Sequence, residues 1–174
     1  DMKGKIRVIS RCRPLAKYEL EMNAQQVVTF LDDTTMRIDS KHGPKEFMYD
    51  SVFSPSQSQG EVYADVGHLV TTAVDGYNVC LFAYGQTGSG KTWTMTGDIK
   101  TPELNGITPR AMEQIFEEVD SITRKGTGTV SVTTYFVELY NDTLVDLYYK
   151  VDNPHGKDPP KLEIKMDGNK MVYI

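Results

Sequence analysis

The sequence has few cysteines and no long apolar run. Its 174 residues include only Cys12 and Cys80, each inside an apolar segment and without C-x-x-C spacing, so neither a disulfide framework nor a zinc site is expected. No apolar stretch approaches the roughly 20 residues that a helix needs to cross a bilayer, and the first residues lack the apolar segment of a secretory signal. We therefore expect no membrane span and a location in the cytoplasm.

Positive charge is also scarce. The chain carries 19 Lys and Arg against 24 Asp and Glu, a formal net charge of -5. Domains that bind nucleic acid through bulk charge present a basic surface instead. We therefore expect no nucleic-acid partner, and a polyanionic partner would have to meet a local basic patch.

Two common enzyme signatures are missing. No G-x-S-x-G nucleophile motif occurs, and Gly126-Thr127-Gly128 lacks the third glycine of a dinucleotide fingerprint. The three histidines show no metal-ligand spacing. These absences argue against a serine hydrolase and a dehydrogenase.

What is present is the element order of an α/β protein, in a chain long enough for one core, so we expect a single unit over residues 1–174. Asn78–Tyr84 and Thr129–Leu139 are apolar on both faces, which is typical of strands inside a covered sheet. Helical spacing of apolar residues predicts a helix over Glu61–Val74 and another from a Thr108 cap to Ile122. Residues 27–31 and 36–38 around the turn Asp32–Thr35 predict a hairpin, and residues 46–53 predict a further strand, so this part should be a small antiparallel layer. The fold class expected is α/β, a central sheet with helices on both faces plus this layer.

The most informative stretch is the octapeptide GQTGSGKT at residues 85–92, which fits G-x-x-x-x-G-K-[ST] between a predicted strand and a predicted helix. Glycines let successive backbone N–H groups approach an anion, and a helix start adds further N–H groups. The Lys91 ammonium would reach the β and γ phosphates, and the Thr92 hydroxyl would complete the shell of a Mg²⁺ held chiefly by the nucleotide. The predicted phosphate-binding residues are Gly85, Gln86, Thr87, Gly88, Ser89, Gly90, Lys91 and Thr92, in a P-loop NTPase-type sheet.

The loop does not identify the base. A guanine-specific protein would usually carry an N/T-K-x-D element, and none occurs in the sequence. ATP with Mg²⁺ is therefore the favoured ligand.

The segment FAYGQTGSGKT resembles the phosphate loop of kinesin motor domains, and Arg11-Cys12-Arg13-Pro14 is similar to their R-x-R-P element. The resemblance implies ATP hydrolysis coupled to movement on microtubules of the cytoskeleton. Residues 3–8 and 161–165 look most like the C-terminal-motor group, particularly the kinesin-like calmodulin-binding protein type. A calmodulin-type regulator would act outside these residues. Further matching segments, in the family's order, are Tyr49–Phe53, Glu61–Tyr63, Asp75–Asn78, Gly106–Arg110 and Glu138–Asp142.

The resemblance also implies roles for residues outside the loop. Arg11, Arg13 and Pro14 would flank the adenine. Trp93 lies where its indole could pack against the base, or it could be a core tryptophan at a helix start. Lys165 and Lys170 could present positive charge to tubulin, or belong to an ordinary solvated hairpin.

The family's N-x-x-S-S-R-S-H and D-x-x-G-x-E segments do not occur in the sequence. Asp146 is interpreted as a solvated or capping residue and not as their substitute, so no catalytic residue is assigned. We expect the chain to be the N-terminal half of a kinesin motor domain, truncated before these switch segments, with little ATP turnover by itself. The alternative is a module that holds nucleotide and docks on microtubules without turnover.

Overall fold

A computed structural model of the chain describes residues 6–126, 128–154, 156, 160–168 and 172–173. The contacts divide the chain into two units, residues 1–128 and 129–174, and each is described by itself. The expectation of one unit over the whole chain stays a prediction. No helix in the described residues is both long and apolar enough to span a membrane.

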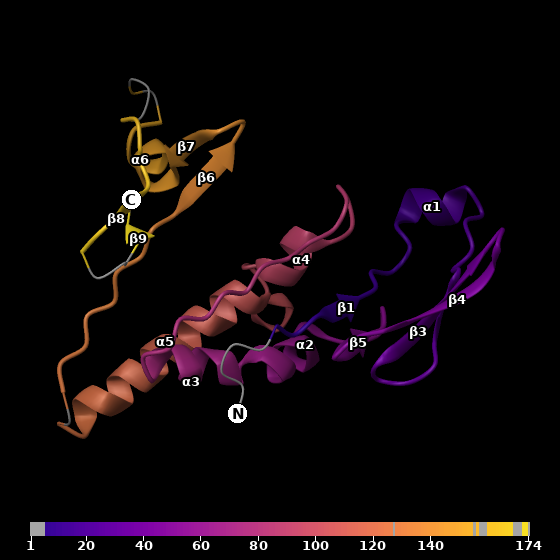
Figure 1. The fold of residues 1–174 in the computed structure, drawn as a ribbon, viewed down its shortest axis with the longest axis horizontal. Coiled ribbons are helices and arrows are strands. Elements are labelled where there is room, and N and C mark those ends of the chain that lie inside the picture. The colour runs from indigo at the N-terminus through magenta and orange to yellow at the C-terminus, as the bar shows by residue number, and fades with distance from the viewer. Residues whose placement is uncertain (1–5, 127, 155, 157–159, 169–171, 174) are drawn as a thin grey trace. The chain divides into compact units, whose positions relative to one another are not determined.

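The first unit begins with two small sheets (Figure 1). Strand β1 (Ile9–Arg11) pairs in parallel with β5 (Ser51–Phe53). Strands β2 (Val28–Phe30), β3 (Thr35–Ser40) and β4 (Gly43–Met48) form an antiparallel sheet in that order. The predicted antiparallel layer is confirmed, and the short helix α1 (Lys17–Glu21) precedes it along the chain.

One predicted strand, residues 46–53, is divided between these two sheets. The division falls at Asp50, whose backbone N–H donates to the Val8 carbonyl at 2.9 Å and whose carboxylate accepts from the Val8 N–H at 2.8 Å. This pairing takes the chain from the edge of β3 to the edge of β1, so that β5 can join β1 in parallel.

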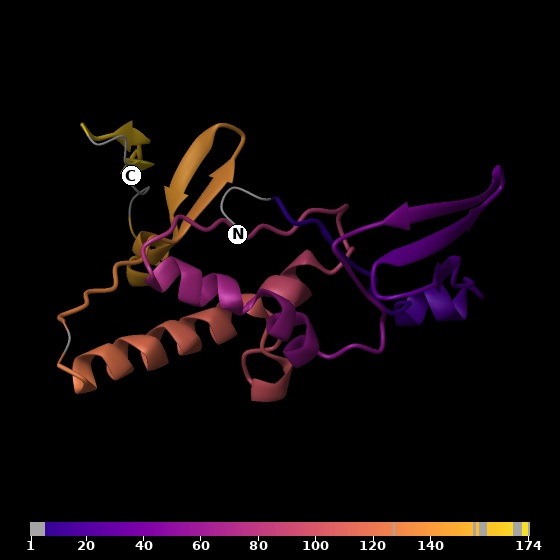
Figure 2. The same cartoon turned by 60° about the horizontal axis from the view of Figure 1, so that its bottom comes forward.

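Three helices pack against one another. They are α2 (Gln59–Val66), α3 (His68–Val74) and α5 (Ile107–Arg124). Figures 1 and 2 both show α5 lying along α2 and α3, in agreement with their contacts. The core cluster joins residues of β5, α2 and α5, and its buried members are Phe53, Val62, Val66 and Ile107.

The helices begin and break differently from the sequence prediction. Ser58 caps α2 and forms a capping box with Glu61. The predicted single helix over residues 61–74 is two helices that meet at Gly67, whose carbonyl accepts a hydrogen bond from Gln114 of α5 at 3.2 Å. The α5 helix is confirmed, but its N-cap is Gly106 and not Thr108.

The mixed α/β class is confirmed, whereas two of the predicted buried strands are wrong. Asn78–Tyr84 has no strand hydrogen bonds, and Phe82 and Tyr84 are 79% and 94% exposed. Of Thr129–Leu139 only the last residues enter a strand. A strand inside a sheet needs backbone partners on both edges, and within the described residues the parallel sheet holds only β1 and β5.

The second unit consists of short elements. Strands β6 (Val137–Tyr140) and β7 (Thr143–Asp146) form a hairpin, whose turn residues Asn141 and Asp142 have φ of 48° and 58°. The helix α6 (Leu147–Asp152) follows, and the Asp146 carboxylate accepts from the Tyr149 N–H at 3.1 Å. Asp146 is therefore a helix cap, as expected. Strands β8 (Lys165–Met166) and β9 (Val172–Tyr173) pair antiparallel.

Candidate nucleotide-binding site

The glycine-rich loop lies directly before helix α4 (Lys91–Met95). Its glycines Gly85, Gly88 and Gly90 have φ of 155°, 79° and 98°, a backbone region that residues other than glycine rarely adopt. A Cβ on Gly85 would lie 2.5 Å from the Ser89 Oγ. The loop therefore takes a curled path that depends on its glycines.

Lys91 folds back over this loop. Its Nζ donates hydrogen bonds to the carbonyl oxygens of Gly85 and Gln86, each at 2.9 Å. An ammonium group has three N–H donors and no acceptor. One donor and the positive charge are left for an anion beside the loop.

Thr92 follows in the first turn of α4, with its side chain exposed. The described residues contain no group of three or more His, Cys, Asp or Glu side chains arranged to hold a metal ion by themselves. A curled glycine loop, one ammonium and one exposed hydroxyl are the groups that a magnesium triphosphate requires. The residues present therefore fit this ligand.

The R-x-R-P segment lies beside the loop. The Arg11 Nη1 donates to the Thr94 Oγ1 of α4 at 3.1 Å and to the Gln59 Oε1 at 2.8 Å. The Arg13 Cβ is 3.8 Å from the point that a Cβ on Gly90 would occupy. The structure thus brings together two motifs that are more than 70 residues apart in the sequence.

Burial and ion pairing shift the pKa values of these two arginines. Burial lowers the pKa of the Arg11 guanidinium. Arg13 donates to both carboxylate oxygens of Glu19, at 2.6 and 2.7 Å. This pair raises the pKa of Arg13. Together with the Ala16 N–H, which donates to the same carboxylate at 2.7 Å, it lowers the pKa of Glu19 to about 2.

Pro14 and Trp93 complete the predicted base-binding residues. The Pro14 carbonyl accepts a hydrogen bond from the Arg13 Nη1 at 3.0 Å, so Pro14 lies beside the Arg13 guanidinium. Trp93 is 43% exposed, and the interpretation as a core tryptophan is therefore wrong. Its packing against a base stays a prediction.

Sequence reasoning missed one residue of this region. Gln59, the first residue of α2, is only 4% exposed, and it contacts Arg11, Trp93 and Leu104 through its side-chain amide. A signal for it exists in the sequence. Gln59 occupies the same helical face as the buried Val62 and Val66, where an apolar residue would be expected.

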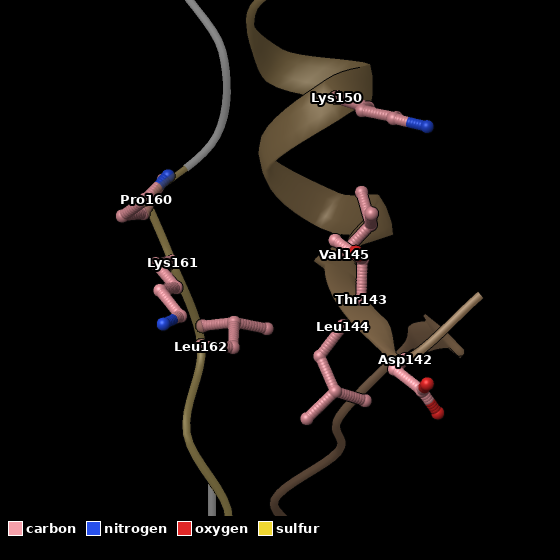
Figure 3. A pocket seen from close by; sticks show the side chains of 8 residues that line it. All are labelled: Asp142, Thr143, Leu144, Val145, Lys150, Pro160, Lys161 and Leu162. Atoms are coloured by element: carbon pink, nitrogen blue, oxygen red, sulfur yellow. The ribbon is translucent and has the colours of Figure 1, made fainter. Parts of the chain in front are cut away.

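The predicted tubulin-contact residues belong to the second unit. Lys165 lies in β8 and is exposed, and Lys170 lies outside the described residues. This unit also contains a pocket of about 450 Å³, in which Leu162 points toward the β7 segment (Figure 3). The pocket includes none of the predicted nucleotide-binding residues. It is lined by Asp142, Thr143, Leu144, Val145, Lys150, Pro160, Lys161 and Leu162.

Comparison with known proteins matches residues 11–174 to the family described as the kinesin motor domain. The chain is 44% identical over its whole length to kinesin-like protein KIN-14E of Arabidopsis thaliana and to kinesin-like protein KIN-14I of Oryza sativa subsp. japonica, and it covers 13% of each. A solved structure of a fast kinesin superposes with a TM-score of 0.78 at 32% identity, over 97% of this chain and 46% of that chain. The chain thus spans a small part of these curated relatives and less than half of the solved one.

Proposed function

Because the chain belongs to the kinesin motor domain family, we propose that its loop at residues 85–92 holds the triphosphate of ATP with Mg²⁺. In the whole protein this site serves a motor that couples ATP hydrolysis to movement on microtubules. The observation that carries the proposal is the position of the Lys91 ammonium, held by the Gly85 and Gln86 carbonyls. A positive charge held beside the loop attracts the β and γ phosphates.

Each remaining group of the site has one task in this proposal. The loop N–H groups bind phosphate oxygens, and the Thr92 hydroxyl is a ligand of the nucleotide-bound Mg²⁺. When bound, the metal neutralises charge on the phosphates. Arg11, Arg13, Pro14 and Trp93 flank the adenine, since Arg11 contacts Thr94 of α4 and Arg13 lies near Gly90 of the loop.

The partners follow from the family. The motor binds microtubules and is located on the cytoskeleton in the cytoplasm, with Lys165 and Lys170 as contacts to the acidic filament. A calmodulin-type regulator that acts outside residues 1–174 stays a prediction.

A second candidate is a module that holds nucleotide on the microtubule without turning it over. It concerns residues 1–174 alone, which do not contain the N-x-x-S-S-R-S-H and D-x-x-G-x-E segments. These segments would position the attacking water, and the loop alone supplies little of that chemistry.

The loop is tested by ligand-dependent stability. Mg·ATP at about 100 times its dissociation constant should raise the free energy of unfolding of the wild-type chain by roughly 2.7 kcal/mol. Lys91→Ala should lose most of this gain. Lys100→Ala, which removes an exposed lysine beyond α4, should keep it. Urea unfolding with and without Mg·ATP measures the difference, and an equal gain in the wild type and Lys91→Ala would count against the proposed loop.

A further inference from the structure

Gln59 is a buried polar side chain to which the proposed function gives no task. Burying an amide is unfavourable unless its hydrogen bonds are replaced. The protein replaces the hydrogen bonds that this amide would make with water. The Gln59 Oε1 accepts from the Arg11 Nη1 at 2.8 Å, and the Nε2 donates to the carbonyl oxygens of Trp93 at 2.8 Å and Leu104 at 3.3 Å. Since arginine only donates and carbonyls only accept, the amide has one workable orientation.

The partners of Gln59 belong to three separate segments of the chain. Arg11 comes from the R-x-R-P segment, Trp93 from the first turn of α4, and Leu104 from the connector between α4 and α5. The Arg11 Nη1 also donates to Thr94 of α4 at 3.1 Å. The guanidinium is therefore held between two acceptors, and Gln59 links it to the α4 backbone.

We propose that Gln59 is a positioning residue for the nucleoside end of the bound nucleotide, because it holds Arg11 in place beside the phosphate loop. This inference rests on the proposed function. Without Gln59, the long arginine side chain would have to be ordered when nucleotide binds, and ordering a flexible side chain at that step lowers affinity. Among the described residues, the Gln59 side chain makes hydrogen bonds to Arg11 and to the Trp93 and Leu104 carbonyls, and none to the Lys91 side chain or the loop at residues 85–90. We therefore expect its loss to affect the phosphate contacts less than the nucleoside end.

Two ligands distinguish the nucleoside end of the site from its phosphate end. Mg·ATP contains the nucleoside and the triphosphate, whereas Mg·tripolyphosphate contains only the latter. In Gln59→Met, which removes all three hydrogen bonds, the dissociation constant of ATP should rise about tenfold, and that of tripolyphosphate should stay within about twofold of wild type. Gln59→Glu keeps an acceptor for Arg11 but sets its second oxygen against the Trp93 and Leu104 carbonyls, so its ATP affinity should lie between those of the wild type and Gln59→Met.

A double-mutant cycle tests whether Gln59 acts through Arg11. If it does, Gln59→Met should add little to the loss of ATP affinity already caused by Arg11→Met. Titration calorimetry measures both ligands, and circular dichroism with urea unfolding establishes that each variant is folded. Should Gln59→Met fail to fold, Gln59→Asn replaces it, because the shorter amide withdraws from Arg11 and remains polar.

The outcomes are distinct. Three results would overturn the role of Gln59 and leave the proposed loop intact. They are unchanged ATP affinity in Gln59→Met, an equal loss of affinity for both ligands, and additive effects in the double-mutant cycle. If the wild-type chain binds neither ligand, the proposed function fails and the inference fails with it. Selective loss of ATP affinity that is absent on an Arg11→Met background supports the inference.

Discussion

Glu19 gives the chain a pH dependence that can be stated with its sign. Its pKa in the folded chain is about 2, below the ordinary value of 4.5, because it accepts hydrogen bonds from Arg13 and from the Ala16 N–H. The unfolded chain therefore takes up this proton at higher pH than the folded chain. The stabilisation from Glu19 is complete above about pH 4.5 and is lost as the pH falls toward about 2.

We expect Glu19→Gln to be less stable than the wild type at pH 7 and to approach it in stability near pH 2. Urea midpoints at pH 7, 4, 3 and 2 measure the convergence. Glu21→Gln is the matched control, because it removes an exposed carboxylate from the same short helix and should follow the wild-type curve. A constant gap between Glu19→Gln and the wild type at every pH would contradict the assigned cause.

The residues that could be predicted are those with a local pattern. The octapeptide at 85–92 predicts its own backbone, because glycine at fixed spacing before a lysine is needed wherever a loop curls around phosphate. The place of Gln59 on an apolar helical face indicates that it is buried but does not identify its partners, and Glu19 carries no such pattern. Their partners lie 48 and 6 residues away in the sequence, and Gln59 becomes a partner of Arg11 only when the chain folds.

The connector between α4 and α5 depends on close backbone contact at Gly97. Gly97 has φ of 68° and pairs with Asn105. A Cβ there would collide with the Leu104 carbonyl oxygen and lie 2.6 Å from the Gly106 nitrogen. These contacts hold the connector, including the short helix η1 (Pro102–Leu104), against the end of α4.

Gly97→Ala should therefore destabilise the chain by more than the backbone conformation alone explains. Gly76→Ala is the control, since Gly76 has φ of 98° and nothing within 4 Å of its Cβ position, so it should cost only about 1–2 kcal/mol. Gly97→Ala adds a steric clash worth about 1–3 kcal/mol. Urea unfolding compares the two variants, and equal losses would show that close packing at Gly97 contributes nothing.

The elements that could be predicted are those with a complete signal in their own residues. The apolar period of α5 and the Asp32–Thr35 turn of the β2–β3 hairpin are examples, and both are observed. The break at Gly67 and the change of sheet at Asp50 could not be predicted, because each depends on a hydrogen bond from a distant residue, Gln114 or Val8. Helical period alone continues through Gly67.

The strand predicted at Asn78–Tyr84 was wrong for a reason that concerns the whole chain. Its residues are apolar on both faces, and Phe82 and Tyr84 are largely exposed. The solved kinesin structure is more than twice as long as the part that this chain covers. Apolar residues on both faces indicate that a segment is covered on both sides in a complete sheet. Such a segment forms a strand only where neighbouring strands supply its hydrogen-bond partners.

The same reasoning gives the prediction for activity. If residues 1–174 hold nucleotide but lack the groups that position water, they should bind Mg·ATP with little or no hydrolysis, and microtubules should not accelerate it. The full-length protein that contains the missing segments should hydrolyse ATP, with microtubules increasing the rate. Phosphate release measured with and without microtubules checks both chains.

Lys91→Ala in the full-length protein should lower its rate of ATP hydrolysis by at least about a hundredfold. A full-length protein that microtubules fail to stimulate would defeat the motor proposal. Rapid turnover by residues 1–174 alone would show that these residues already contain the groups that position water.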